Sequence, residues 1–146
     1  MSDFQIKSRA TGTKQDTRWR TSSHGEDAAR PGQLDPSAFT SGTHYNIPGQ
    51  DKNVIPSGVA VAKLANGLFG PYSATAGADD TDPRRTLAGF INDNEGVSLG
   101  DDPATAKPTF ARLVHGIVNP SLLPIAAQRT TVKTAKTIIS VTYVED

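Results

Sequence analysis

The chain has 146 residues, a length that suits one compact domain and is too short for two ordinary ones. Its 15 basic and 15 acidic residues cancel, so bulk electrostatic binding to nucleic acid or to an anionic membrane is not expected. The lack of cysteine excludes disulfides, thiolate metal sites and a cysteine nucleophile. No stretch resembles a membrane helix or the apolar part of a signal peptide, so we expect a soluble protein made in a cytoplasm.

Residues 1–50 contain few apolar side chains, and over most of this segment those side chains follow no helical or strand period. A segment of this kind, rich in Ser, Thr, Gly, Asp and Arg, cannot offset an ordering entropy of about 1 to 2 kcal/mol per residue. The sequence therefore predicts an extended N-terminal arm over residues 1–50 and a folded body over residues 51–146.

Two features of the predicted arm indicate that it binds a partner. Phe4 and Ile6 alternate with polar residues, which is the pattern of a strand. Trp19 is the only tryptophan, and a tryptophan between two arginines is typical of an interface anchor. The alternative is that these residues belong to a solvated tail. The predicted contact residues are Phe4, Ile6, Lys7, Arg18, Trp19 and Arg20.

The body is predicted to be mainly β with little helix, an α+β class in which short strands are divided by Gly and Pro. Asn66-Gly67 predicts a hairpin, because both residues accept the positive φ of a tight turn. A turn at 55–58 precedes a short buried strand over 59–64. Further strands are expected over residues 86–91, 112–118 and 137–144, with polar loops over 73–85 and 92–107.

The last predicted strand and one short helix complete the body. Ile139, Val141 and Tyr143 share one apolar face while the other face is mixed, which favours a central or interface position for the strand. A helix is expected over residues 120–129, with Asn119 or Ser121 as its cap and Pro124 limiting it to a turn or two.

The sequence contains no recognisable catalytic or metal-binding motif. The histidines at positions 24, 44 and 115 lack the short spacings that bring ligands to one metal. Asp79, Asp80 and Asp82 are interpreted as a solvated turn, because the loop glycine and distant glutamate of an EF-hand are missing. Phosphate loops and nucleophile motifs are also missing, so we predict neither an enzyme nor a cofactor.

Four stretches of the body, taken in order, resemble a known family. They are IPSGVAVAKL at 55–64, GLFGPY at 67–72, TLAGFI at 86–91 and LVHGIVNPSLL at 113–123. The series is similar to the head decoration proteins of tailed bacteriophages, the group typified by the lambda gpD protein. The residues that carry the family pattern are Pro56, Gly58, Gly67, Gly70, Pro71, Tyr72, Gly89 and Asn119.

The resemblance implies a non-enzymatic capsid cement protein with a small, irregular β-rich fold. Members of the family form homotrimers on the outer surface of the virion head, at three-fold positions of the major capsid protein, and stabilise the head against internal DNA pressure. Their N-terminal arm orders on the capsid. At about 50 residues the predicted arm is longer here than in compact members of the family.

Two alternatives from other classes remain open at this stage. A phage fibre or receptor-binding β domain would share a trimeric β character but should present a carbohydrate groove lined by aromatic side chains. A nucleic-acid-binding accessory protein would use the basic excess of residues 1–20, where five basic residues face two acidic ones. The balanced charge of the body gives this last alternative little support.

Overall fold

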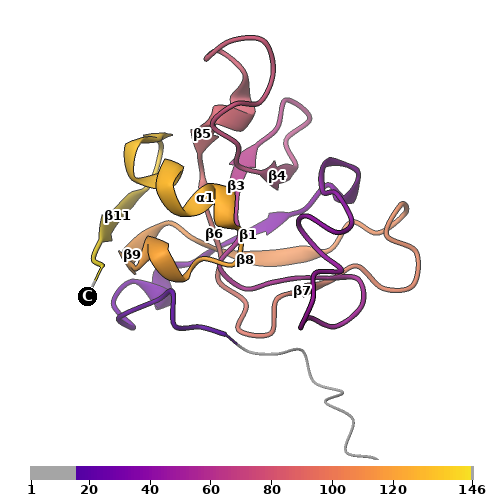
Figure 1. Cartoon of the computed structure of the whole chain (residues 1–146), viewed down its shortest axis with the longest axis horizontal. Coiled ribbons are helices and arrows are strands. Elements are labelled where there is room, and N and C mark those ends of the chain that lie inside the picture. Colours follow the sequence, from indigo (N-terminus) through magenta and orange to yellow (C-terminus); the bar gives the residue numbers. More distant parts are fainter. Residues whose placement is uncertain (1–15, 146) are drawn as a thin grey trace, which may run out of the picture.

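The computed structural model describes residues 16–145, which form a small, irregular body made mainly of short strands (Figure 1). The strands are β1 (Arg30–Gln33), β2 (Val54–Ile55), β3 (Ala60–Lys63), β4 (Phe69–Pro71), β5 (Thr86–Leu87), β6 (Gly89–Ile91), β7 (Val97–Ser98), β8 (Thr109–Leu113), β9 (His115–Val118), β10 (Lys136–Thr137) and β11 (Ser140–Tyr143). The helical segments are α1 (Ala126–Thr131) and the 3-10 turns η1 (Glu26–Ala28), η2 (Pro36–Ala38), η3 (Pro83–Arg85), η4 (Pro120–Leu122) and η5 (Val132–Thr134). The predicted β-rich class with little helix is confirmed.

An antiparallel five-stranded sheet in the order β1-β8-β6-β3-β4 forms the centre of the body. Its two outer strands approach each other, because Leu34, which follows β1, bridges to Phe69 in β4. The Leu34 amide donates to the Pro108 carbonyl at 2.9 Å, and the Asp35 amide donates to the Phe69 carbonyl at 2.9 Å. The sheet therefore curls, and its edges protect one another from pairing with other chains.

Alternation along the central strands sends side chains into two apolar clusters, one on each face of the sheet. In β3, Val61 enters one cluster while Ala60 and Ala62 enter the other; in β6, Ile91 and Phe90 divide in the same way. The first cluster is closed by the loops between β1 and β3. The second is covered by α1, η4, β9 and β11, with Leu123 and Val132 among the buried residues.

The cover over the second cluster is fixed to the sheet by a buried glutamine. Gln128 of α1 is 3% exposed, and its Oε1 accepts from the Ala60 amide at 2.9 Å. Its Nε2 donates to the carbonyl oxygens of Ala60, at 3.0 Å, and of Tyr72, at 2.9 Å. Figure 1 shows α1 lying against the upper part of the sheet. The bonds of Gln128 pair the Ala60 amide and the Tyr72 carbonyl, and they give the Ala60 carbonyl a second donor besides the Tyr72 amide.

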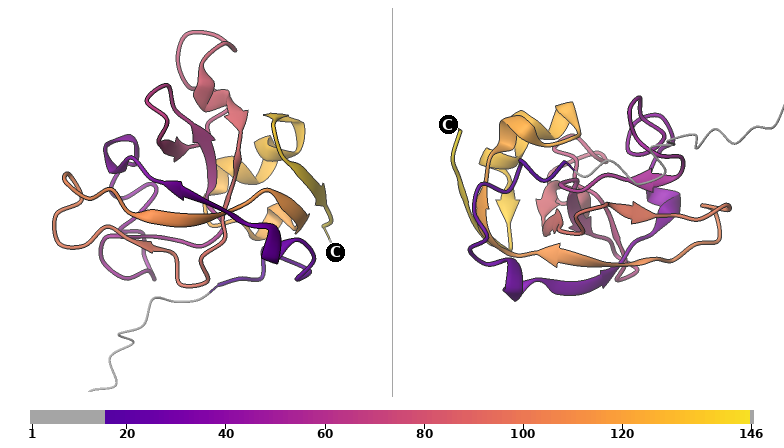
Figure 2. Two further views of the ribbon diagram at one scale, coloured as in Figure 1. Left: turned by 180° about the vertical axis from the view of Figure 1, so that it is seen from behind. Right: turned by 90° about the horizontal axis from the view of Figure 1, so that it is seen from below.

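The boundary predicted at residue 50 does not separate an arm from a body within the described residues, because residues 16–50 pack against the rest of the chain. β1 pairs along its whole length with β8, and the two strands lie side by side in both views of Figure 2. Leu34, Phe39 and Tyr45 lie in the first apolar cluster, and Trp19 lies in the second. Residues 16–50 consist of β1, two 3-10 turns and irregular loops, and their few large apolar side chains enter the clusters at positions that follow no period.

The predicted hairpin is confirmed. β3 and β4 pair in antiparallel register around Asn66-Gly67, with Gly67 at φ 85°. The Leu64 amide donates to the Leu68 carbonyl at 2.8 Å and closes the turn. The turn before β3 is also present, at Ser57-Gly58.

Three other predicted strands are each divided into two. The breaks lie at Ala88, at Val114 and at residues 138–139, where the chain leaves one sheet and joins another. The predicted loop over 92–107 contains β7, which pairs with β2. The predicted helix is η4 followed by α1, interrupted at Pro124 because proline cannot continue the turn that precedes it.

The last predicted strand does not have a central position. Within residues 16–145, β11 pairs only with β9, in parallel register, and so lies at an edge. The prediction about its faces holds: Ile139, Val141 and Tyr143 pack against the second cluster, while Ile138 is 65% exposed.

Replacing Trp19 by Ala tests whether residues 16–50 belong to the body. Removing this fully buried ring should lower the free energy of unfolding by about 3 to 5 kcal/mol, measured by urea denaturation. Arg18→Ala is the matched control, because the neighbouring side chain is 73% exposed and its loss should change stability by no more than about 0.5 kcal/mol. Equal, small effects of the two substitutions would mean that the segment lies outside the folded unit.

Candidate functional site

The predicted contact residues occupy three different environments. Phe4, Ile6 and Lys7 lie outside the described residues. Arg18 is exposed, whereas Trp19 is completely buried and the Arg20 side chain is only 9% exposed. Of the three predicted contact residues that the structure describes, only Arg18 is therefore open to an external partner, and Trp19 contacts its own chain instead.

Trp19 is an anchor, but for the chain's own body. Its indole Nε1 donates to Ser57 Oγ at 3.1 Å, and its ring lies 5.8 Å from the Phe90 ring centroid in a tilted arrangement. Gly58, at φ 93°, faces the indole so closely that an added Cβ would lie 2.8 Å from Trp19 Cδ1. The turn before β3 therefore requires glycine both for its backbone conformation and for the approach of the ring.

Arg20 connects three parts of the fold. Its Nε pairs with Glu26 Oε1 at 2.9 Å, and its Nη1 donates to the Asn92 carbonyl at 2.8 Å. Its Nη2 donates to the Asn94 side chain, and the guanidinium carbon lies 5.2 Å from the Trp19 ring centroid. These contacts use the planar fork of the guanidinium within the body, so Arg20 has a structural role here.

An open hollow of about 250 Å³ lies where the described chain begins. Asp16 and Arg18 form part of its rim and pair with each other at 2.9 Å, which holds the pKa of Asp16 below its usual range. The remainder is lined by residues 47, 48, 50, 56–57 and 121–124 together with Arg129, whose Nε donates to the Leu123 carbonyl at 2.7 Å. Pro56, one of the family-pattern residues, lines this hollow.

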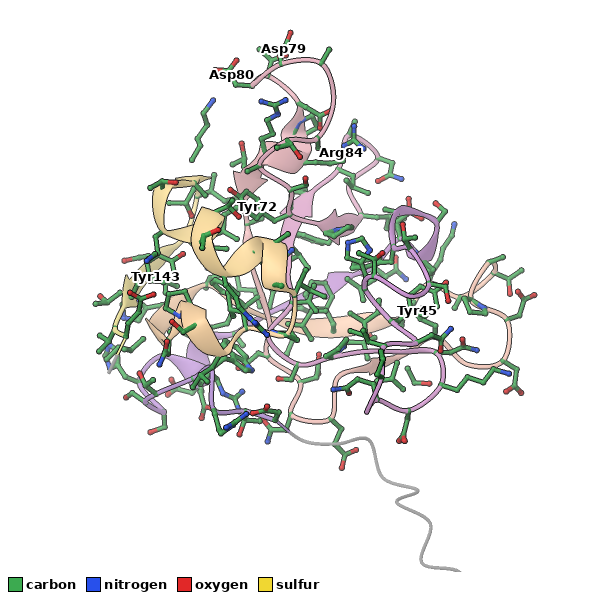
Figure 3. All side chains as sticks on the ribbon, viewed as in Figure 1. Tyr45, Tyr72, Asp79, Asp80, Arg84 and Tyr143 are labelled. Atoms are coloured by element: carbon green, nitrogen blue, oxygen red, sulfur yellow. The ribbon has the colours of Figure 1, made fainter. Side chains whose placement is uncertain are left out.

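The other family-pattern residues hold the fold together. Gly70 and Pro71 of β4 pair with Ala62 and Val61 of β3, and Gly89 of β6 pairs with Val61 from the other side. The Tyr72 hydroxyl donates to the Thr131 carbonyl at 3.2 Å and so reaches the end of α1, as Figure 3 indicates. These positions therefore form the centre of the body and offer no reactive group.

Asn119 confirms the predicted cap. Its side-chain oxygen accepts from the Ser121 backbone amide at 3.0 Å at the start of η4, and the backbone amide of Asn119 donates to the Trp19 carbonyl at 2.7 Å. Asn119 thus joins the turn after β9 to the segment that carries the buried indole. The sequence indicated the capping role but gave no signal for the second bond, which links residues 100 positions apart.

The acidic loop between β4 and β5 extends away from the body, with Asp79 and Asp80 at its tip (Figure 3). Asp79 Oδ1 accepts from the Thr81 amide at 3.0 Å, and Asp82 Oδ2 pairs with Arg84 Nη2 at 2.8 Å. The hydrogen bond from Arg84 lowers the pKa of Asp82 to about 2. This geometry agrees with the interpretation of a solvated turn, because two of the carboxylates are directed toward groups of their own loop.

Within residues 16–145, no group of three His, Cys, Asp or Glu side chains is placed to hold a metal ion. None of the helices in this part of the chain has the length and apolar character needed to span a membrane. No family model, curated protein or solved structure matches the chain.

Substituting glycines by alanine separates the two demands on the turn before β3. Gly58→Ala should be strongly destabilising, because positive φ costs about 1 to 2 kcal/mol and the clash with Trp19 adds about 1 to 3 kcal/mol of overpacking. Gly67→Ala is the matched control, because Gly67 has φ 85° but nothing lies within 4 Å of the added Cβ. Its loss of stability should therefore come only from the unfavourable backbone conformation. The free energy of unfolding of both variants is measured by thermal and urea denaturation. An equal loss of stability in the two variants would show that the added Cβ at Gly58 does not clash with the Trp19 ring.

Proposed function

We propose that the chain is a structural decoration protein of a tailed-bacteriophage head. In this proposal it binds as a homotrimer to the outer surface of the mature capsid, at three-fold positions of the major capsid protein. Because it binds the assembled shell and not its free subunits, mass action stabilises the shell against the internal pressure of the packaged DNA. It acts through binding and performs no catalysis.

The observation that carries the proposal is where the four resembling stretches lie. The stretches at 55–64, 67–72 and 86–91 supply β3, β4 and β6, which are neighbours in the central sheet or lie one strand apart. The stretch at 113–123 supplies β9 and η4, which cover the second apolar cluster. Stretches that are separate in sequence thus form one contiguous, buried centre, as expected if together they encode one family fold.

The edge strand β11 is the contact we propose between copies of the chain. Among residues 16–145 it has β9 as its only strand partner, which leaves its other edge available for pairing with a second chain. Ile138 is the exposed large apolar side chain in the described part and lies two residues before β11. The strand contains no charged side chain, because Ser140, Val141 and Thr142 do not ionise and the Tyr143 phenol, whose pKa burial raises to about 12, is neutral at neutral pH.

The contact with the capsid is assigned to the N-terminal residues and to the rim from which they start. Lys7, Arg9 and Lys14 outnumber Asp3 in residues 1–15, so this segment suits an acidic partner surface. Phe4 and Ile6 would occupy pockets while their backbone adds a strand to the capsid protein. Arg18, which is exposed on the rim of the hollow and paired there with Asp16, is the proposed contact residue on the body itself.

The alternatives gain no support from the described residues. A carbohydrate-binding fibre domain needs exposed aromatic faces, but Trp19, Tyr45 and Tyr72 are buried and Tyr143 is half-buried. A nucleic-acid-binding protein needs basic side chains that are available to phosphates, but Arg18 is paired with Asp16 and Arg20 with Glu26.

Binding to purified phage heads tests the proposal. We expect the protein to co-sediment with expanded heads and not with unexpanded ones, and to be resolved as trimers at three-fold positions in a reconstruction. Deleting residues 2–8 should weaken binding at least about tenfold, which needs only about 1.4 kcal/mol, because burying Phe4 and Ile6 supplies about 1.5 to 3 kcal/mol each before entropy. Replacing both residues by Ser should reproduce most of this loss, and the body should stay folded.

Controls separate the attachment from the rest of the proposal. Replacing Lys7 and Arg9 by Gln should mainly reduce the salt dependence of binding. Wild-type occupancy by the deletion variant would mean that the body carries the attachment. No binding to either kind of head, or a stable dimer both in solution and on the head, would refute the proposed function.

A further inference from the structure

Two histidines that are far apart in sequence meet on the surface of the body. His24 lies in the segment before β1, and His115 is the first residue of β9. Their Nε2 atoms lie 2.9 Å apart, and their ring centroids are 4.8 Å apart in an edge-to-face arrangement. Both residues are exposed, so solvent and small ions reach the pair.

The backbone itself produces this approach. Each histidine is followed by a glycine, and a Cβ added to Gly25 would lie 2.2 Å from the His115 carbonyl oxygen. A Cβ added to Gly116 would lie 3.0 Å from the His24 carbonyl oxygen. The two His-Gly pairs therefore cross at a distance that larger residues would not permit, and the crossing places the imidazoles together.

The hydrogen bonding of His115 leaves one ring nitrogen available as a ligand. Its Nδ1 lies 3.0 Å from the Ser140 carbonyl oxygen, which can only accept, so Nδ1 carries the proton. In the neutral ring, Nε2 then holds a free lone pair directed toward His24. A ring N–H held by a backbone carbonyl is the arrangement that orients histidine ligands in metal sites.

We propose that His24 and His115 form a surface site for a divalent transition-metal ion of the Ni²⁺ or Cu²⁺ class. Metal–imidazole bonds are about 2.0 to 2.1 Å long, and two such bonds to atoms 2.9 Å apart subtend an angle of roughly 90°. This is the angle between neighbouring ligands in octahedral and square-planar complexes, which Ni²⁺ and Cu²⁺ prefer. Water fills the other positions, because no third protein ligand of the described residues joins the pair.

Binding requires one change of tautomer and no redox step. In the His–His contact, His24 Nε2 must carry the proton that it shares with His115. On metal binding Nε2 gives this proton to water while Nδ1 of the same ring takes one up from water, and the two rings turn so that both Nε2 lone pairs face the ion. The ion then connects the segment before β1 to β9 and should raise the thermal stability of the folded protein.

Calorimetric titration of the full-length, untagged protein with NiCl₂ tests this site, which does not depend on the proposed function. We expect one saturable site per chain, and His24→Gln and His115→Gln should each weaken nickel binding at least tenfold. His44→Gln is the matched control, because it removes the remaining histidine from a different loop and should leave the affinity unchanged. Paramagnetic broadening by Ni²⁺ should be confined to amide signals around residues 24 and 115.

Each other outcome overturns the proposal. It fails if the wild type shows no saturable binding, if either substitution at the pair leaves the affinity unchanged, or if broadening centres on the N-terminal amine or on His44. Circular dichroism checks that the variants are folded. If His115→Gln fails to fold, the affinity of His24→Gln for nickel tests the site by itself. This variant should fold, because His24 is exposed and its neighbours in sequence are loop residues.

Discussion

The burial of Trp19 determines which part of the chain belongs to the folded body. A tryptophan buries about 150 to 250 Å² of surface, which at about 25 cal/mol per Å² contributes roughly 4 to 6 kcal/mol before the entropy of the segment is subtracted. The indole joins the second apolar cluster against Phe90 and is held by Ser57. Because its backbone carbonyl also accepts from the Asn119 backbone amide, segments 100 residues apart in sequence meet at this residue.

The segment that follows Trp19 is held to the body by a series of contacts. Arg20 links the loops at Glu26 and Asn92, and β1 then runs along β8 to Leu34, where the two edges of the central sheet meet. This wrapping supplies side chains to both apolar clusters, so a body of short, irregular strands obtains a larger core than residues 51–146 alone would provide. In the proposed function, such a body is a rigid platform from which residues 1–15 reach the capsid.

Local signals in the sequence predicted the parts of the fold that depend on local interactions. Asn66-Gly67 specified the hairpin because the turn conformation depends on those two residues, and Asn119 specified a cap because its side chain bonds two residues onward. β1 gave no such signal, since its sequence RPGQ has no apolar alternation and its pairing depends on the backbone of β8. The sequence indicated Trp19 as an anchor for an external partner, whereas the structure shows its ring bound within the same chain, and composition could not distinguish these two cases.

The candidate sites show the same division between local and distant contacts. Gly70, Gly89 and Tyr72 of the resembling stretches could be identified from sequence as structural positions, and they lie at the centre of the body. His24 and His115 could not be paired from sequence, because 91 residues separate them and only the crossing of β9 with the earlier segment brings them together. The bonds from Gln128 to β3 and β4 are equally distant in sequence and had no local signal.

Native-state hydrogen exchange of the full-length protein in solution tests most directly whether Trp19 fixes residues 16–50 to the body. The informative amides are those of Leu34, Asp35 and Asn119, which donate to Pro108, Phe69 and Trp19. We expect all three amides to exchange only through global unfolding, with the same protection as amides in β3, and Trp19→Ala to lower their protection together. Rapid exchange of Leu34 and Asp35 in an otherwise protected protein would contradict it, because residues 16–50 would then be a separate arm.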